Sequence, residues 1–229
     1  TTDHGFMLGE HDWWAKNRMP LYNEIANVPL FFYHPDYKQY QGEQRNVVTQ
    51  NIDLMPTFLS MHGHSIPKEV TGKSLVEFLD KDSSKKYSAL YGYWGGGINI
   101  TDGEYTYFHY PENFSQQNPN RYQYTLMPTN MRQFFSLEEL RSASLHKPFN
   151  FTKETPVLKI NRIERQTDGG YKGYEDTKSA LYKLQNDPGQ LSPIHDKNLF
   201  KKYQDMMIKI IKQYDPPKEL LHNYFNINN

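Results

Sequence analysis

The sequence predicts an α/β fold that continues into a small antiparallel β-sheet covered by an amphipathic C-terminal helix. Three observations indicate this arrangement. A continuous apolar run at 28–33 is typical of a strand buried on both faces. Short strand-like segments flank Asp102-Gly103, which is a strong two-residue hairpin signal. Apolar residues then recur with helical spacing from Leu199 to Tyr214, where Pro216-Pro217 ends the pattern.

The first expected domain, residues 1–82, has an α/β pattern. After the strand at 28–33, residues 52–62 predict a helix with Asp53 at its N-cap and Gly63 as its stop. Four apolar residues of this helix are expected to form its buried side: Leu54, Phe58, Leu59 and Met61. A second, short helix is expected at 74–79.

The second expected domain, residues 83–229, contains the antiparallel sheet and the terminal helix. Ser136 and Glu139 form a capping-box pattern that predicts a helix running toward Leu145. The terminal helix is expected to pack on the sheet through its apolar stripe. The remaining expected elements are strands at 88–94, 98–101, 104–110 and 180–184, a long polar loop at 114–130, and a turn at 186–189.

Composition excludes several functional classes. The 26 basic and 26 acidic residues balance, so no nucleic-acid partner is expected. No apolar run approaches the ~20 residues of a membrane span. The chain has no cysteine, which excludes disulfides, thiolate metal sites and a cysteine nucleophile within it.

The residues that carry chemistry lie at the N-terminus. Asp3 and His4 place a carboxylate beside an imidazole, as a metal-binding loop requires. Adjacent residues of a regular strand point to opposite faces, so these two can share an ion only where the chain turns, which Gly5 makes easy. Lys16 follows closely and can hold an anion on such a metal. Each signal also has an ordinary structural explanation, either a polar loop or a solvated surface lysine.

The order of these motifs is more specific than any one of them. The stretch from Thr2 to His11, then Trp14-Ala15-Lys16, then Met19 to Glu24 and Val28-Pro29-Leu30, resembles the second half of the sulfatase family. The resemblance continues in three later segments: Asp53 to Thr57, Gly72 to Leu75, and Leu181 to Gly189. It is dense from Thr2 to Leu79 and returns near Tyr182.

This resemblance implies a fold similar to alkaline phosphatase and an enzyme that hydrolyses sulfate esters. Sulfatases use a formylglycine nucleophile beside a divalent cation, usually calcium. By similarity, Asp3 and His4 would be metal ligands, and Lys16 would be the catalytic group that contacts a sulfate oxygen. His11 is a second expected substrate contact. Many relatives have Asn at the position of His4, and imidazole is more at home on zinc or manganese than on calcium.

The family's nucleophile motif, Cys or Ser followed by x-Pro-x-Arg, does not occur in this sequence. We therefore expect the chain to be a C-terminal portion that is inactive alone. Its expected partners are an upstream N-terminal half of the same enzyme, a sulfated small molecule or glycan, and a second copy that pairs through the apolar edge at 28–33. Two alternatives remain open: a phosphonate or phosphodiester hydrolase of the same superfamily, and a non-catalytic binding module.

Overall fold

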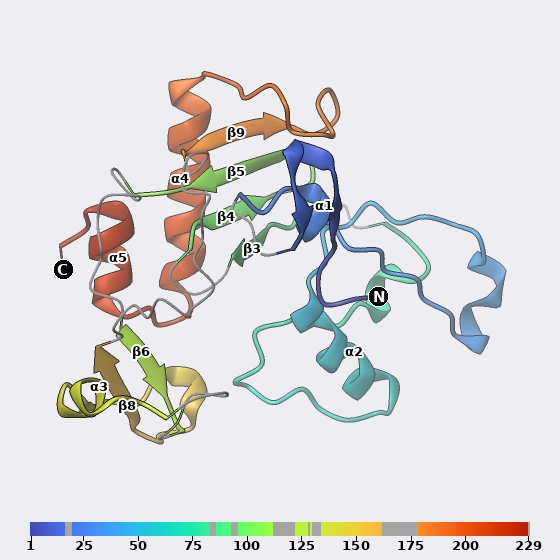
Figure 1. Ribbon diagram of the computed structural model, residues 1–229. Helices are drawn as coiled ribbons and strands as arrows, with labels where there is room; N and C mark the ends of the chain where they lie inside the picture. Colours follow the sequence, from blue (N-terminus) through green and yellow to red (C-terminus); the bar gives the residue numbers. More distant parts are fainter. Residues whose placement is uncertain are drawn as a thin grey trace.

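The computed structural model describes residues 1–16, 20–82, 86–92, 96–111, 122–127, 129, 134–161 and 178–228 of the 229-residue chain. Within this part, the strands form three antiparallel sheets, and helices pack around them (Figure 1). The predicted mixed α/β class with a small antiparallel sheet is confirmed. The division at residue 82 stays a prediction.

The central sheet has four strands in the order β3-β4-β5-β9, and all neighbours are antiparallel. The predicted strands are confirmed, and β9 lies at one edge of the sheet. The hairpin loop is longer than two residues, because pairing resumes only where Thr101 lies opposite Thr106, and the Asp102 carboxylate accepts the N–H groups of Glu104 and Tyr105. The strands are β3 (Ala89–Gly92), β4 (Ile98–Thr101), β5 (Tyr105–His109) and β9 (Ala180–Lys183).

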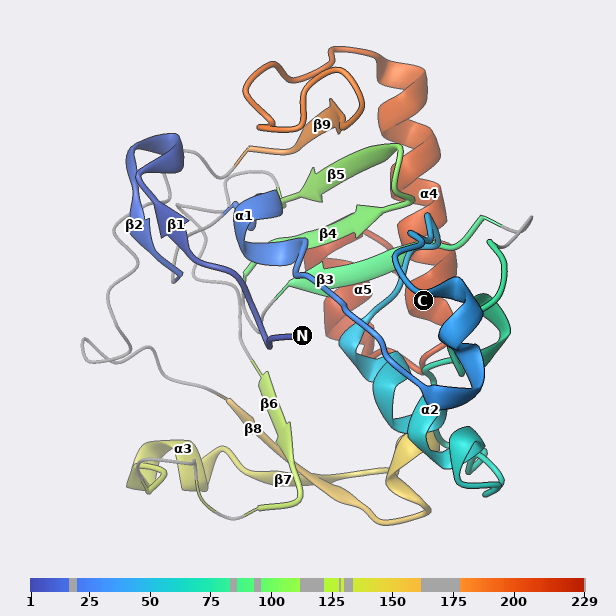
Figure 2. The same ribbon diagram turned by 90° about the vertical axis from the view of Figure 1, so that its right-hand side faces the viewer.

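Alternating side chains divide the core between the two faces of this sheet. Tyr107 and Leu181 share one buried cluster with helix α4 (Lys197–Lys212). Phe108 and Tyr182 share the other cluster with the N-terminal segment, which contains β1 (Met7–Leu8) and α1 (Asn23–Ala26). Figure 2 shows the sheet between α4 and α1. The N-terminal segment is therefore held by packing on the sheet.

The C-terminal helix α4 follows the predicted stripe. Tyr203, Met207 and Ile211 are its buried residues, and the Asp196 carboxylate caps its N-terminus. An additional helix that the sequence did not predict, α5 (Lys218–Phe225), follows the two prolines. None of the helices described by the structure combines the length and the apolar character that a membrane-spanning helix needs.

A three-stranded sheet of order β6-β8-β7 forms the lower layer of Figure 1. Its strands are β6 (Tyr122–Thr125), β8 (Val157–Asn161) and β7 (Ser144–His146). The predicted loop at 114–130 is wrong where β6 forms, while residues 112–121 lie outside the described part. The capping box of Ser136 and Glu139 is confirmed, but helix α3 ends at Arg141. The chain then extends into β7, because Leu145 pairs with Leu158 of β8.

Helix α2 (Leu54–Met61) confirms the helix predicted at 52–62, preceded by a 3₁₀ turn, η3 (Asn51–Asp53). Gly63 ends it with φ of 70°, a conformation that favours glycine. The predicted buried side is wrong at Phe58, which is 55% exposed, while Leu54, Leu59 and Met61 are partly buried. The buried residues of the helix are Pro56 and Thr57. The expected helix at 74–79 is a single 3₁₀ turn, η4 (Val76–Phe78). Three further 3₁₀ turns are η1 (Glu10–Asp12), η2 (Pro35–Tyr40) and η5 (Asn150–Thr152).

The strand predicted at 28–33 is also wrong for this chain. The segment belongs to none of the three sheets. Phe31 and Tyr33 are 87% and 66% exposed. A strand requires a partner that accepts its backbone hydrogen bonds, and the described part of the chain offers none at this segment.

Candidate functional site

The Asp3-His4-Gly5 loop lies against helix α1. The Gly5 N–H donates to the Ile25 carbonyl at 2.8 Å. A Cβ atom at Gly5 would lie 1.8 Å from the Glu24 carbonyl oxygen, so only glycine fits this close approach. The glycine of the motif therefore brings the two polar side chains onto the α1 backbone.

Hydrogen bonds orient the two candidate metal ligands toward each other. His4 Nδ1 lies 2.9 Å from the Gly5 carbonyl, so Nδ1 carries the proton and Nε2 presents its lone pair. Asp3 Oδ1 accepts from the Thr2 hydroxyl and from the His4 N–H, each at 3.1 Å. The other carboxylate oxygen, Oδ2, lies 3.4 Å from His4 Nε2. One oxygen and one nitrogen donor thus converge at the surface.

The hairpin of β1 and β2 (Trp14–Ala15) brings Lys16 back to this pair. Met7 pairs with Ala15, so the residue after β2 returns beside the start of β1. Lys16 Nζ lies 2.9 Å from His4 Nε2. Thus Asp3, His4 and Lys16, which the sequence predicted to act together, do lie together.

The electrostatics of the pair favour a cation. The hydrogen bond from the Thr2 hydroxyl, more than any other contact, holds the pKa of the Asp3 carboxyl below its ordinary value. Asp3 is therefore a carboxylate at neutral pH. The Lys16 ammonium already donates to the His4 lone pair, which shows that this lone pair is accessible to a cation.

Two donors fit part of a cation site. A carboxylate oxygen and an imidazole nitrogen 3.4 Å apart are close enough to contact one divalent ion. The described residues contain no group of three or more His, Cys, Asp or Glu side chains arranged to hold a metal. Asp3 and His4 can therefore supply two ligands, and further ligands would come from other groups.

His11, the second expected substrate contact, lies in a more enclosed position. Its ring stacks on Tyr22 at 3.6 Å with an interplanar angle of 4°. Its Nε2 lies 3.7 Å from Glu24 Oε2, and its side chain is 9% exposed. The structure thus places His11 against α1, and its contact with substrate stays a prediction.

The sequence did not reveal Asn51 as a support of the loop. Its side-chain amide donates to the backbone carbonyls of Thr2 and Asp3, at 3.1 and 3.4 Å. Asn51 is the first residue of η3, and the buried Asp53 is the last. The Asp53 carboxylate fixes this turn by accepting hydrogen bonds from the backbone N–H of Lys73 at 2.9 Å and from the Lys73 ammonium at 3.1 Å. Gly72 permits this clamp, because its Cβ would lie 2.1 Å from the Ile52 carbonyl oxygen. The capping pattern of Gln50 and Asp53 was the available sequence signal.

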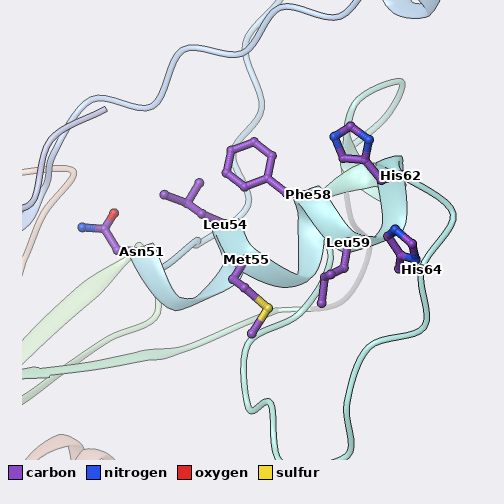
Figure 3. Close-up of a pocket in the computed structure, with 7 residues that line it drawn as sticks. All are labelled: Asn51, Leu54, Met55, Phe58, Leu59, His62 and His64. Atoms are coloured by element: carbon purple, nitrogen blue, oxygen red, sulfur yellow. The ribbon is translucent and has the colours of Figure 1, made fainter.

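A largely apolar pocket of about 500 Å³ lies along α2. Figure 3 shows the side chains that line it: Asn51, Leu54, Met55, Phe58, Leu59, His62 and His64. Asn51 connects this pocket to the candidate site, since its amide also holds the Asp3 loop.

Comparison with known proteins identifies the family. Residues 9–122 match the family model described as N-sulphoglucosamine sulphohydrolase, C-terminal. The N-acetylglucosamine-6-O-sulfatase of Bacteroides thetaiotaomicron is 33% identical over 98 residues, which are 41% of this chain and 17% of that protein. An arylsulfatase of Clostridium perfringens is 36% identical over 93 residues, 40% of this chain and 19% of the relative. The chain belongs to the sulfatase family.

Solved structures support the sulfatase fold. A putative sulfatase from Bacteroides thetaiotaomicron aligns with 93% of this chain and 34% of its own, with a TM-score of 0.53 and 19% identity. A protein solved in complex with its substrate D-glucosamine-2-N,6-O-disulfate aligns with 99% of this chain and 34% of its own, with a TM-score of 0.52 and 17% identity. This sulfatase chain therefore spans about one third of these structures and less than a fifth of its curated relatives in the matched segments.

Proposed function

We propose that this chain forms one side of the active site of a sulfuric ester hydrolase. In this proposal Asp3 and His4 are ligands of a divalent cation and Lys16 binds the sulfate group. The observation that carries it is the meeting of three groups at one exposed point: Asp3 Oδ2 lies 3.4 Å and Lys16 Nζ 2.9 Å from His4 Nε2. His11 is proposed as a further substrate contact.

The role proposed for each residue follows from its charge and from the position of its protons. A bound divalent cation would act as a Lewis acid on a sulfate oxygen. Asp3 holds a negative charge toward the cation, and His4 keeps its proton on Nδ1, so its Nε2 can coordinate. Lys16 then turns its ammonium to the sulfate and offsets the charge that develops there. Calcium is the proposed ion, although His4 also suits zinc or manganese.

The nucleophile of the proposed reaction is a formylglycine carried by sulfatase polypeptide other than this chain. The chain contains no cysteine and no Ser-x-Pro-x-Arg motif from which formylglycine could form. It is therefore proposed to be inactive toward aryl sulfates by itself. Two relatives support a sulfated small molecule or glycan as substrate: one is named an N-acetylglucosamine-6-O-sulfatase, and one binds a disulfated glucosamine.

Cation binding by the chain alone tests the proposed ligands. Titration with Mn²⁺ should broaden the NMR signals of Asp3 and His4 through paramagnetic relaxation, and Asp3→Asn should weaken this effect at least tenfold. The chain offers a matched control in Asp36, which is 82% exposed like Asp3 and lies 3.8 Å from His34 Nδ1. Asp36→Asn should leave the broadening at Asp3 unchanged. Equal loss in both variants, or no selective broadening at Asp3 and His4, would contradict the assignment.

A phosphodiester or phosphonate hydrolase is a second candidate. The chain is 34% identical over 80 residues to a multifunctional alkaline phosphatase superfamily protein of Trinickia caryophylli. A panel of aryl sulfate, phosphonate and phosphodiester substrates, given to this chain together with a formylglycine-bearing sulfatase part, distinguishes the two activities. Turnover of none of them would favour a non-catalytic binding module.

A further inference from the structure

The hairpin that ends at Lys16 has a strained backbone. In the turn η1 between β1 and β2, His11 and Asp12 have positive φ angles of 50° and 55°. In β2, Ala15 has φ of 101°. Residues other than glycine rarely adopt such angles, and they do so only where the surrounding structure holds them. A specific contact must therefore hold this hairpin in its observed shape.

His11 makes the contact that holds the turn. Its ring stacks face to face on Tyr22, with 3.6 Å between the ring centroids and an interplanar angle of 4°. Its Nε2 lies 3.7 Å from Glu24 Oε2, and the His11 side chain is 9% exposed. Tyr22 is itself buried and meets the Phe108 ring of β5 edge-on, with 5.5 Å between the centroids. The turn is thus connected to the central sheet through stacked rings.

The metal-binding loop and the turn rest on the same support. Gly5 contacts the backbone of α1, and this contact fixes the loop that carries His4. Tyr22, on which the His11 ring stacks, immediately precedes α1. Figure 2 shows β1, β2 and α1 together beside the central sheet. One short segment therefore sets the position of the His4 loop relative to the hairpin that carries Lys16.

The pairing of β1 with β2 is too short to hold Lys16 by itself. Each strand contributes two residues to the pairing, and an isolated two-stranded hairpin is marginally stable in water. Met7 and Trp13 pack in the core on either side of the turn, so neither fixes the angles of the turn itself. Lys16 directly follows β2, and its Nζ lies 2.9 Å from His4 Nε2. This distance depends on the direction that the turn gives to the returning chain.

We propose that His11 is a positioning residue for Lys16. The stack on Tyr22 holds the strained turn, and the turn directs the chain back to His4. Without the His11 ring, the turn relaxes to ordinary backbone angles and Lys16 Nζ leaves His4 Nε2. This inference rests on the proposed function, because Lys16 is taken to bind sulfate from this place. It does not depend on the substrate contact proposed for His11.

NMR spectroscopy of the chain alone tests this role without metal, sulfate or turnover. The wild type should show a nuclear Overhauser cross-peak between the Lys16 ε-methylene protons and the His4 ring protons. His11→Ala should weaken this cross-peak at least fivefold and shift the ¹⁵N signal of His4 Nε2, which loses the Lys16 ammonium as a donor. The amide signals of Ile100 and Leu181, which lie in the core cluster on the α4 side of the sheet, should not change.

Two further variants separate positioning from a loss of folding. His11→Phe keeps a ring that can stack on Tyr22, and it should retain at least half of the cross-peak intensity. His34→Ala is the matched control, because His34 Nδ1 also lies 3.8 Å from a carboxylate, that of Asp36, and its ring lies 5.6 Å from the Tyr37 ring. This control should leave the Lys16–His4 cross-peak unchanged.

Three results would overturn the proposal. They are a loss of less than fivefold in His11→Ala, a retention of less than half in His11→Phe, and an equal loss in His34→Ala. Shifts of the Ile100 and Leu181 signals as large as those at His4 would also overturn it, because the loss would then be one of folding. If the cross-peak depends on His11 but the site does not bind a cation, the proposed function fails and the positioning role stands.

Discussion

Helices α4 and α2 differ in the side chains that they bury. On α4 the apolar residues Tyr203, Met207 and Ile211 pack on the central sheet, and the exposed side is polar. On α2 the buried residues are Pro56 and the hydrogen-bonded Thr57, next to the buried Asp53 of η3, whereas Met55 and Phe58 are 47% and 55% exposed. Both helices have apolar residues at helical spacing in the sequence. The difference teaches that apolar residues at helical spacing do not by themselves decide which face of a helix is buried.

The largest expected effect on stability comes from the polar side of α2. Asp53→Ala should lower the free energy of unfolding by about 3–5 kcal/mol, because it removes the buried partner of the Lys73 ammonium and leaves the N–H groups of Gln50 and Lys73 without an acceptor. Urea unfolding followed by circular dichroism measures the change. Glu43→Ala, which removes the 49%-exposed partner of Arg45, should cost less than about 1 kcal/mol. Equal losses would show that hydrogen bonds do not anchor α2.

A pair of methionines compares the two helices directly. Met207 on α4 is fully buried, and Met55 on α2 is 47% exposed. Met207→Ala should cost about 2–4 kcal/mol of unfolding free energy through lost contacts and a cavity, whereas Met55→Ala should cost less than about 0.5 kcal/mol. Thermal and urea unfolding of the two variants measure these two losses of unfolding free energy. A loss of more than about 1 kcal/mol at Met55 would mean that this chain itself covers α2.

A smaller effect is expected where α5 meets the sheet. His109 donates from Nε2 to the Tyr224 carbonyl at 2.7 Å and stacks on Phe225, and burial lowers the pKa of its ring. Folding therefore favours the neutral ring, and the unfolded chain binds more protons. This contribution to stability is complete above the ordinary His pKa of about 6.5 and is lost as pH falls toward the lowered value, by at most about 1.4 kcal/mol per pH unit.

The variant His109→Gln measures this contribution. Unfolding free energies of wild type and variant, compared between pH 7.5 and pH 5, should show a steeper fall in the wild type. Identical pH dependence in the two proteins would remove His109 as the cause.

Much of the structure of the C-terminal part could be predicted from the sequence, because its strands and helix pack against other elements of the same chain. The Asp102-Gly103 turn signal lies between paired strands, and the stripe of α4 meets a sheet within the same chain. Helix α3 was predicted too long because cross-strand pairing of Leu145 overrode helical spacing. The strand at 28–33 and the buried side of α2 were wrong for a different reason. Each pattern specifies a contact that the described chain does not make.

The proximity of the three candidate residues was predictable from the sequence, whereas the contacts that hold them in place were not. Asp3, His4 and Lys16 came from motif order, and the structure brings them together. The contacts that hold them come from distant residues, as with Asn51 on the Asp3 carbonyl and Gly5 against α1. The spacing of residues in a local motif does not indicate contacts between residues that lie tens of positions apart in the sequence.

The role proposed for Lys16 is to act on sulfate at the site of Asp3 and His4. Its most direct test is kcat/KM for an aryl sulfate in an enzyme assembled from this chain and a formylglycine-bearing sulfatase part. Lys16→Ala should lower kcat/KM at least 100-fold, about 2.7 kcal/mol of transition-state stabilisation, while Lys86→Ala, at a 78%-exposed lysine paired with Glu104, should leave it within twofold. A loss of less than tenfold in Lys16→Ala would contradict the account.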